Sequence, residues 1–227
     1  IEMRAMEDPE GLAALRICMQ IAAAARTGPG HLFGVVIARM IAISMKLGNA
    51  PASAYAFAAY AGLLCSGLGD PALGYQYGRM ALDLVEKLEA RDMRCRVYYL
   101  YASSVHHWQN PAQESSQYLL HAYQAGLETG DLEYVASVIF LLTCAPLWTG
   151  NKPLDEISSD IDRFGNALYR TGQKHVLELT ALCRQYISNL QGGSRNRARL
   201  TGERFYEDDV SAEWRNADYS EGLYYLQ

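Results

Sequence analysis

Turn-forming residues recur at regular intervals along most of this chain, and they limit its fold more than any other feature. The breaks fall at Gly28-Pro29, Gly48-Asn49, Gly69-Asp70, Arg91-Asp92, Asn110-Pro111, Gly130-Asp131, Gly150-Asn151, Gly172-Gln173 and Gly192-Gly193. They lie roughly 20 residues apart, which accommodates one helix of four to five turns and a short loop. Glycine suits such breaks because helices commonly end on a left-handed residue.

Between the breaks, the apolar residues follow a helical period. One helix face after Asp92 is marked by Val97, Leu100, Tyr101, Ser104 and Trp108, with the spacing of an amphipathic helix. Half of the 227 residues are hydrophobic and only seven are proline. These features together predict an all-α fold.

Two successive helices would form a hairpin of about 41 residues, and small side chains recur at this interval. Gly62, Gly74, Gly78 and Ala81 of one hairpin correspond to Ser103, Ser115, Leu119 and Ala122 of the next. Small side chains there would let neighbouring helices approach closely. The spacing resembles the tetratricopeptide pattern, lengthened by about one turn per helix. We predict a right-handed superhelix of antiparallel helix hairpins, in which each repeat buries its apolar face against its neighbours.

The predicted organisation has three parts. Residues 1–192 are expected to form the tetratricopeptide-like repeats, residues 193–216 an inter-repeat loop, and residues 217–227 the start of a further repeat helix. Four arginines, Arg195, Arg197, Arg199 and Arg204, lie in a stretch without an apolar face. We interpret this stretch as a flexible, solvated loop, with contact to an acidic protein as the alternative. The chain begins at Ile1 and ends within a predicted helix, so we expect a piece of a longer protein.

Charge and cysteine spacing restrict the function and the compartment. With 20 basic and 25 acidic residues, the net charge is −5, which argues against a nucleic-acid partner. The five cysteines are far apart and have neither metal-ligand nor redox spacing, so a reducing cytoplasm is expected. Residues 47–69 and 134–151 are uncharged, but the first run is mostly Ala and Pro146 interrupts the second. We therefore predict buried helices of a soluble protein rather than membrane spans.

Catalytic motifs are missing from the sequence. It contains no phosphate-binding loop, dinucleotide fingerprint, nucleophile elbow, zinc-protease motif or kinase motif. The nearest arrangement to a metal site is His106-His107 with His121, but adjacent histidines on a helix point about 100° apart. A helix-end histidine packed under Trp108 is the preferred interpretation.

A group of carboxylates is the other candidate for chemistry. Asp155, Glu156, Asp160 and Asp162 share one predicted helix. Paired acids can catalyse proton transfer when their surroundings separate their pKa values, but these four have the pattern of a solvated helix face. We expect no catalytic residue, metal or cofactor in this chain.

Tyrosine is unusually frequent, with 16 residues against five phenylalanines. Its apolar ring and polar tip suit surfaces that are half-buried or that become buried on binding. Most tyrosines are interpreted as packing residues between helices, and a subset as an interaction surface on the concave face. The candidate surface consists of Tyr75, Tyr77, Tyr98, Tyr101, His106, Trp108, Tyr118 and Tyr123.

Three stretches carry a family resemblance. They are Gly69 to Leu82, with Gly74-Tyr75-Gln76-Tyr77-Gly78 at its centre, Val105-His106-His107-Trp108, and the run from Ala122 to Tyr134. They resemble the helical-repeat region of very large bacterial, cyanobacterial-type signalling proteins. Those proteins join a serine/threonine kinase-like domain, an AAA/STAND ATPase, tetratricopeptide-like repeats, a GAF domain and a sensor histidine kinase.

The resemblance implies a regulatory scaffold rather than an enzyme. The implied partners are the neighbouring ATPase and kinase domains of a parent kinase/ATPase. Three alternatives stay open: a peptide or small-molecule effector bound on the concave face, a metal-dependent enzyme that uses His106, His107 or His121, and a homodimer formed through the terminal repeat.

Overall fold

The computed structural model describes residues 4–25, 30–202 and 205–206, and the regular structure of this part is entirely helical. The α-helices are α1 (Pro9–Ala25), α2 (Gly30–Leu47), α3 (Pro51–Ser66), α4 (Pro71–Lys87), α5 (Arg91–Ser104), α6 (Ser115–Thr129), α7 (Leu132–Thr149), α8 (Leu154–Arg170) and α9 (Lys174–Leu190). Two short 3-10 helices, η1 (His106–Trp108) and η2 (Ala112–Glu114), connect α5 to α6. The predicted all-α fold is confirmed.

The predicted breaks coincide with the ends of the helices. Positive φ angles occur at Gly48, Gly69, Gly130, Gly150, Gly172 and Gly192, where a side chain would be strained. At the break predicted at Arg91-Asp92, Glu89 adopts the left-handed conformation instead, with φ 49°. The break at Gly28-Pro29 lies outside the described residues.

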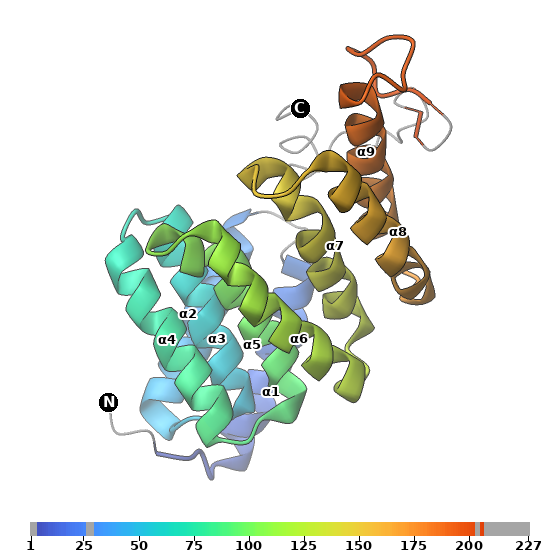
Figure 1. Ribbon diagram of the computed structural model, residues 1–227. Helices are drawn as coiled ribbons and strands as arrows, with labels where there is room; N and C mark the ends of the chain where they lie inside the picture. Colours follow the sequence, from blue (N-terminus) through green and yellow to red (C-terminus); the bar gives the residue numbers. More distant parts are fainter. Residues whose placement is uncertain (1–3, 26–29, 203–204, 207–227) are drawn as a thin grey trace. The chain divides into compact units, whose positions relative to one another are not determined.

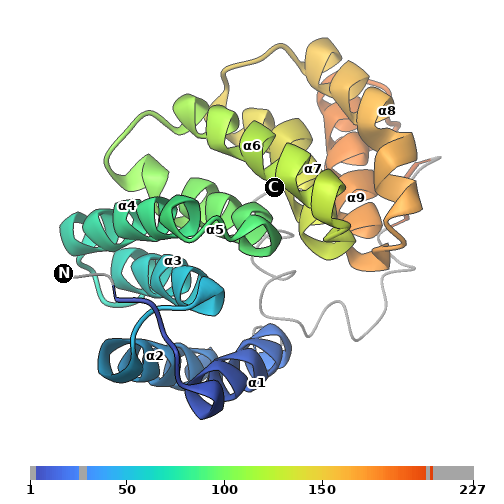
Figure 2. The same ribbon diagram turned by 90° about the horizontal axis from the view of Figure 1, so that it is seen from below.

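The chain divides into two compact units, residues 1–138 and 139–227, whose boundary falls within α7. In the first unit, consecutive helices contact each other as α1 with α2, α3 with α4 and α5 with α6. Further contacts join α3 to α1, to α2 and to α5, so that α3 lies among four neighbours, as the views of Figures 1 and 2 illustrate. The helices therefore pack in adjacent pairs.

This position explains the composition of α3. All eight residues from Ala52 to Ala59 are buried, because neighbouring helices cover several faces of α3 at once. A helix that is apolar on every side belongs inside a protein core or a membrane. The uncharged run that includes residues 51–66 is thus a core helix, and its many alanines keep it thin.

Glycines allow close packing in the first unit. A Cβ atom on Gly62 of α3 would lie 3.1 Å from Cβ of Ser104 on α5. One on Gly78 of α4 would lie 2.8 Å from Val105 Cγ1 and 2.9 Å from Tyr101 Cδ2. The prediction that small side chains bring these helices together is confirmed.

The second unit is built around α8 and α9, which pack side by side in Figures 1 and 2. Its buried core contains Phe140, Cys144, Ile157, Ile161, Leu179, Leu182, Cys183 and Ile187. Each of these residues comes from α7, α8 or α9. The second unit therefore has a hydrophobic core of its own.

The segment after α9 is anchored, contrary to the expectation of a flexible loop without an apolar face. The buried Asn189 side chain donates hydrogen bonds to the carbonyl oxygens of Arg197 (3.3 Å) and Arg199 (2.8 Å). Leu200 and Phe205 pack against the core of the second unit. Residues 207–216 of the predicted loop and the predicted helix at 217–227 lie outside the described residues.

Helix α7 is the one helix of the described part that is long and apolar enough to cross a membrane by length and composition. Tyr134, Val135 and Val138 of this helix are nonetheless buried inside the protein. Pro146 does not end this helix, which continues to Thr149. A proline so near the C-terminus removes the hydrogen bond of one backbone amide and leaves the rest of the helix intact.

Candidate interaction surface

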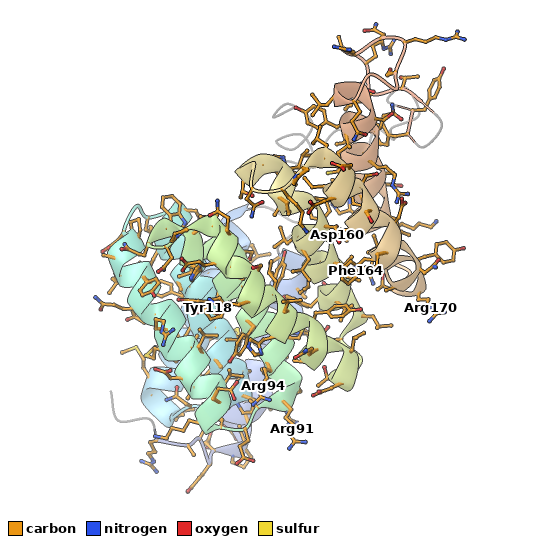
Figure 3. The ribbon with its side chains drawn as sticks, in the orientation of Figure 1. Arg91, Arg94, Tyr118, Asp160, Phe164 and Arg170 are labelled. Atoms are coloured by element: carbon orange, nitrogen blue, oxygen red, sulfur yellow. The ribbon has the colours of Figure 1, made fainter. Side chains whose placement is uncertain are left out.

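The centre of the predicted surface is Tyr101, a fully buried residue of α5. Its ring lies 6.1 Å from that of Tyr75 on α4 and 4.9 Å from that of Tyr118 on α6, measured between centroids. Three helices therefore meet here, and Tyr118 is labelled in Figure 3. Gly78, one turn after Tyr75, makes the meeting close because a larger residue would collide with Tyr101.

His106 fixes the turn beneath these rings. Its Nδ1 atom lies 2.9 Å from the Ser115 hydroxyl, at the start of α6. Its ring lies 5.7 Å from that of Tyr101 and 5.0 Å from that of Tyr118. Burial lowers the pKa of His106, so the neutral imidazole is favoured at neutral pH.

Tyr98 extends the arrangement along α5. Its ring lies 6.3 Å from that of Tyr118 and 5.6 Å from that of His121. Its hydroxyl donates a hydrogen bond of 3.2 Å to Glu86, which also pairs with Arg94 at 2.5 Å. Burial, and then the charge of Glu86, raise the pKa of Tyr98. We use the name tyrosine cluster for Tyr75, Tyr98, Tyr101, His106 and Tyr118.

The other predicted surface residues lie elsewhere. Tyr77 contacts Phe57 and Tyr60 of α3, with centroid distances of 6.1 Å and 5.2 Å. Tyr123 is half-buried on α6, and five residues after Tyr118 it lies on a different helix face. Trp108 is 44% exposed and contacts the ring of His107.

Burial separates the cluster into an interior and a rim. Tyr101 and His106 are 0% and 3% exposed, so they hold the three helices together and cannot meet a partner directly. Tyr75, Tyr98 and Tyr118 are half-buried and form the rim. The prediction of one surface containing all eight residues is wrong for the two buried ones.

Arg79 is a rim residue that the sequence prediction missed. It is exposed on α4, one helical turn after Tyr75, and its guanidinium lies beside the Tyr101 hydroxyl. Partial burial lowers the pKa of Arg79, but the phenol groups around it outweigh this effect and raise it. The four-residue spacing from Tyr75 is the signal in the sequence that places both on one face.

The histidines do not converge on a metal site. His106 contacts Ser115, His107 lies against Trp108, and His121 lies against Tyr98. Within the described residues, no group of three or more histidine, cysteine, aspartate or glutamate side chains is placed to hold a metal ion. The preferred histidine interpretation holds for His107, which is exposed, whereas His106 packs under tyrosines.

The cysteines are not disposed for nucleophilic chemistry. All five are free thiols, and four of them are buried. Burial raises the pKa of Cys95 to about 12. Contact with Cys144, followed by burial, raises the pKa of Cys183. A thiol in such surroundings stays protonated and unreactive at neutral pH.

The predicted acidic helix is α8, and its carboxylates are exposed or paired with cations. Asp155 and Glu156 are exposed in the first turn, where negative charge suits a helix N-terminus. Asp160 (Figure 3) pairs with Lys152, and with Arg163 at 3.1 Å. Asp162 pairs with Arg184 of α9. This arrangement agrees with a solvated helix face.

A pocket of about 720 Å³ lies in the second unit, between α8, α9 and the segment after α9. Its lining is largely polar and includes Ser158, Asp162, Gln185, Ser188, Arg195 and Asn196. Sequence reasoning missed it because Ser158 and Asp162 of α8 lie more than 20 residues before the other lining residues, and no motif links them.

Comparisons of this chain with protein family models, curated proteins and solved structures gave no match. The family resemblance therefore rests on the residues of the chain itself.

Proposed function

We propose that this chain is a non-catalytic helical-repeat region that mediates protein–protein contacts in a multidomain signal-transduction kinase. The observation that carries the proposal is the packing of the first unit. Helix α3 contacts its pair partner α4 and also α5, the first helix of the next pair. Contacts between equivalent helices of neighbouring pairs are typical of repeat proteins, in which each unit buries its face against the next.

The periodic use of small residues supports a right-handed, tetratricopeptide-like stack. Gly74 and Gly78 face α3 and α5 at close range, and Ser115, at the position equivalent to Gly74, is buried at the start of α6. Gly126 of α6 packs against Cys95 of α5, and a Cβ atom added to Gly126 would lie 2.8 Å from Cys95 Sγ. The close contacts of Gly74 with α3 and of Gly126 with Cys95 lie within a helix pair, whereas Gly78 joins the pair of α3 and α4 to α5 of the next pair.

The proposed setting is the one that the resemblance implies. The repeats lie in a cytoplasmic parent protein with ATPase and kinase domains and contact those domains or a further protein. Regulation requires that the repeats bind two states of a neighbouring domain with different affinities, because only a differential interaction shifts an equilibrium.

Effector sensing is the alternative, and the tyrosine cluster gives it little support. The rings of Tyr98, Tyr101 and His106 contact neighbouring rings and occupy the space that an effector would need. Trp108 contacts His107 instead. The cluster suits a protein contact at its rim better than a ligand in its interior.

The test compares the full-length parent protein with two tryptophan variants and with a deletion of residues 1–192. Trp108 and Trp148 are similarly exposed, at 44% and 41%, but only Trp108 belongs to the candidate surface. We expect the deletion and Trp108→Ala to change the rate of ATP hydrolysis, and Trp148→Ala to leave it unchanged. Equal rates for the intact and the deleted protein would refute the regulatory role.

A further inference from the structure

The pocket in the second unit offers a ligand the space that the tyrosine cluster lacks. Its volume of about 720 Å³ lies within the usual range for small-molecule sites, about 300–1,000 Å³. All of its lining residues lie between Ser158 and Tyr206, which places the pocket within the second unit. Its chemistry therefore depends on α8, α9 and the segment after α9.

The lining of this pocket carries more positive than negative charge. Its charged residues are three arginines, Arg184, Arg195 and Arg199, and one acid, Asp162. Asp162 pairs with Arg184, whereas no aspartate or glutamate of the described ranges forms an ion pair with Arg195. The chain as a whole has a net charge of −5, so the pocket reverses the overall sign locally. A recess of positive charge attracts anions.

The segment that carries two of these arginines has a fixed backbone. It turns back along the end of α9 (Figure 1), where the Gly193 amide donates a hydrogen bond of 2.8 Å to the carbonyl oxygen of Ser188. The buried Asn189 side chain holds the carbonyl oxygen of Arg199 at 2.8 Å. Arg195 lies between these two anchors in the sequence, and its side chain is exposed. An anchored backbone lowers the cost of ordering the site when a ligand binds.

Neutral polar groups make up much of the remaining lining. Gln185 is only 4% exposed, and its Nε2 atom donates a hydrogen bond of 2.9 Å to Asn189, a bond in which its amide oxygen takes no part. Gly202 lets the segment approach Gln185, because a Cβ atom there would collide with this amide. Most ligand pockets are lined mainly by apolar side chains. The polar lining here indicates a ligand with polar groups over much of its surface.

We propose that this pocket binds a small hydroxylated anion, whose phosphate or carboxylate group is held by Arg195 and Arg199. A guanidinium binds two oxygens of such a group through parallel hydrogen bonds. The serine hydroxyls and the side-chain amides of the lining suit the hydroxyl groups of the ligand, because they can donate and accept hydrogen bonds. The site goes beyond the proposed function, since it involves neither the tyrosine cluster nor another domain.

The test is an NMR titration of the backbone amides of the 227-residue chain. Sorbitol phosphate and gluconate, which share one polyol skeleton, are added separately, with sodium chloride holding the ionic strength constant. We expect the amide signals of residues 193–196 to shift and to saturate at millimolar concentrations with at least one of these anions. Sorbitol is the uncharged control and should not produce these shifts.

Arg197 provides the matched control for Arg195. Both are exposed arginines of the same segment, but only Arg195 lines the pocket. Arg195→Gln should weaken binding about tenfold or more, the loss expected for hydrogen bonds to a charged group. Arg197→Gln should change it by less than about twofold, because salt screens an exposed charge outside the site. Arg195→Lys should keep part of the affinity, since lysine retains the charge but not the two-pronged geometry.

Asp162→Asn should act in the opposite direction. Its carboxylate is 62% exposed, so the variant should fold, and circular dichroism checks this for every variant. Removing the one negative charge of the lining and releasing Arg184 should strengthen binding by up to about fivefold. A merely structural role of Asp162 would weaken binding instead.

The outcomes separate the explanations. Saturation with sorbitol phosphate alone, or with gluconate alone, identifies the anionic group. No saturation with either anion would overturn the site, and so would equal weakening by Arg195→Gln and Arg197→Gln. Saturation by a short polyglutamate peptide, with no response to either small anion, would make the segment an acidic-protein contact instead. The ATP hydrolysis test is independent of these results, so the failure of one proposal leaves the other standing.

Discussion

Gly74 lies where α4 passes against α3, and no side chain larger than hydrogen fits there. A Cβ atom at this position would lie 2.8 Å from the backbone oxygen of Ala61 and would also collide with Cys65 Sγ. The backbone cannot move aside as the end of a flexible side chain can. His106, at the interface of α5 and α6, likewise depends on its surroundings, because burial lowers its pKa and favours the neutral ring.

Gly74→Ala is expected to destabilise the protein by about 1–3 kcal/mol, the usual cost of overpacking. Gly165→Ala is the matched control, since Gly165 also lies within a helix but a Cβ there would meet nothing within 4 Å. That change should stabilise the protein by about 0.5–1 kcal/mol through helix propensity. Urea unfolding measures both, and equal effects would contradict the packing argument.

The pH dependence of stability tests the burial of His106. Burial lowers the pKa of His106 in the folded protein, so unfolding takes up a proton in the range below the usual value of about 6.5. Stability should therefore be full above about pH 6.5 and should fall as the pH decreases through that range. His106→Asn, which keeps a polar group near Ser115, should reduce this slope, and His107, whose pKa desolvation also lowers, should account for the rest.

His121→Asn is the control for that experiment, because His121 is exposed. It should keep the wild-type slope between pH 7.5 and 5.5, measured by urea midpoints. If stability fell with decreasing pH as steeply in His106→Asn as in the wild type, the conclusion that His106 is buried in its neutral form would be wrong.

At the scale of helices, ion pairs between elements fix how one helix follows another. Arg96 of α5 donates two hydrogen bonds to Asp131, immediately before α7, at 2.6 and 3.3 Å. The Arg96 guanidinium also lies 4.9 Å from the centre of the Tyr134 ring. Both charged side chains are largely buried. Breaking this ion pair should therefore lower the free energy of unfolding more than breaking an exposed pair.

Arg96→Met should lower the free energy of unfolding by about 1–3 kcal/mol, because Asp131 would keep its charge in a poorly hydrated place. Arg94→Met is the matched control on the same helix, since the pair of Arg94 with Glu86 is more exposed. Its loss should cost no more than about 1 kcal/mol. Chemical denaturation measures both variants. If the two substitutions lowered the free energy of unfolding equally, the ion pair of Arg96 with Asp131 would not be what holds α7 against α5.

Helix ends were predictable from the sequence, whereas the interior of the site was not. Six of the predicted breaks contain a glycine with positive φ, because the left-handed conformation selects glycine locally. The burial of Tyr101 depends on α4 and α6, which lie far from it in the sequence. The anchoring of the segment after α9 depends on Asn189, a polar residue whose role a hydrophobic pattern cannot reveal.

At the scale of the whole chain, the helices pack in adjacent pairs. This pairing follows from the contacts within the first unit and from the pair α8 and α9 in the second. The right-handed superhelix, the parent signalling protein and a homodimer through a terminal repeat are proposals from the sequence. A regular stack of helix pairs would explain why small residues recur at about 41 residues, which is twice the spacing of roughly 20 residues between the breaks.

The most direct test of the repeat architecture is a crystal structure of the 227-residue chain. We expect successive helix pairs to stack in order as a right-handed superhelix, with the first helix of each pair contacting the first helix of the next. A closed bundle, in which helices of distant pairs pack against each other, would contradict it. So would a left-handed order of the pairs.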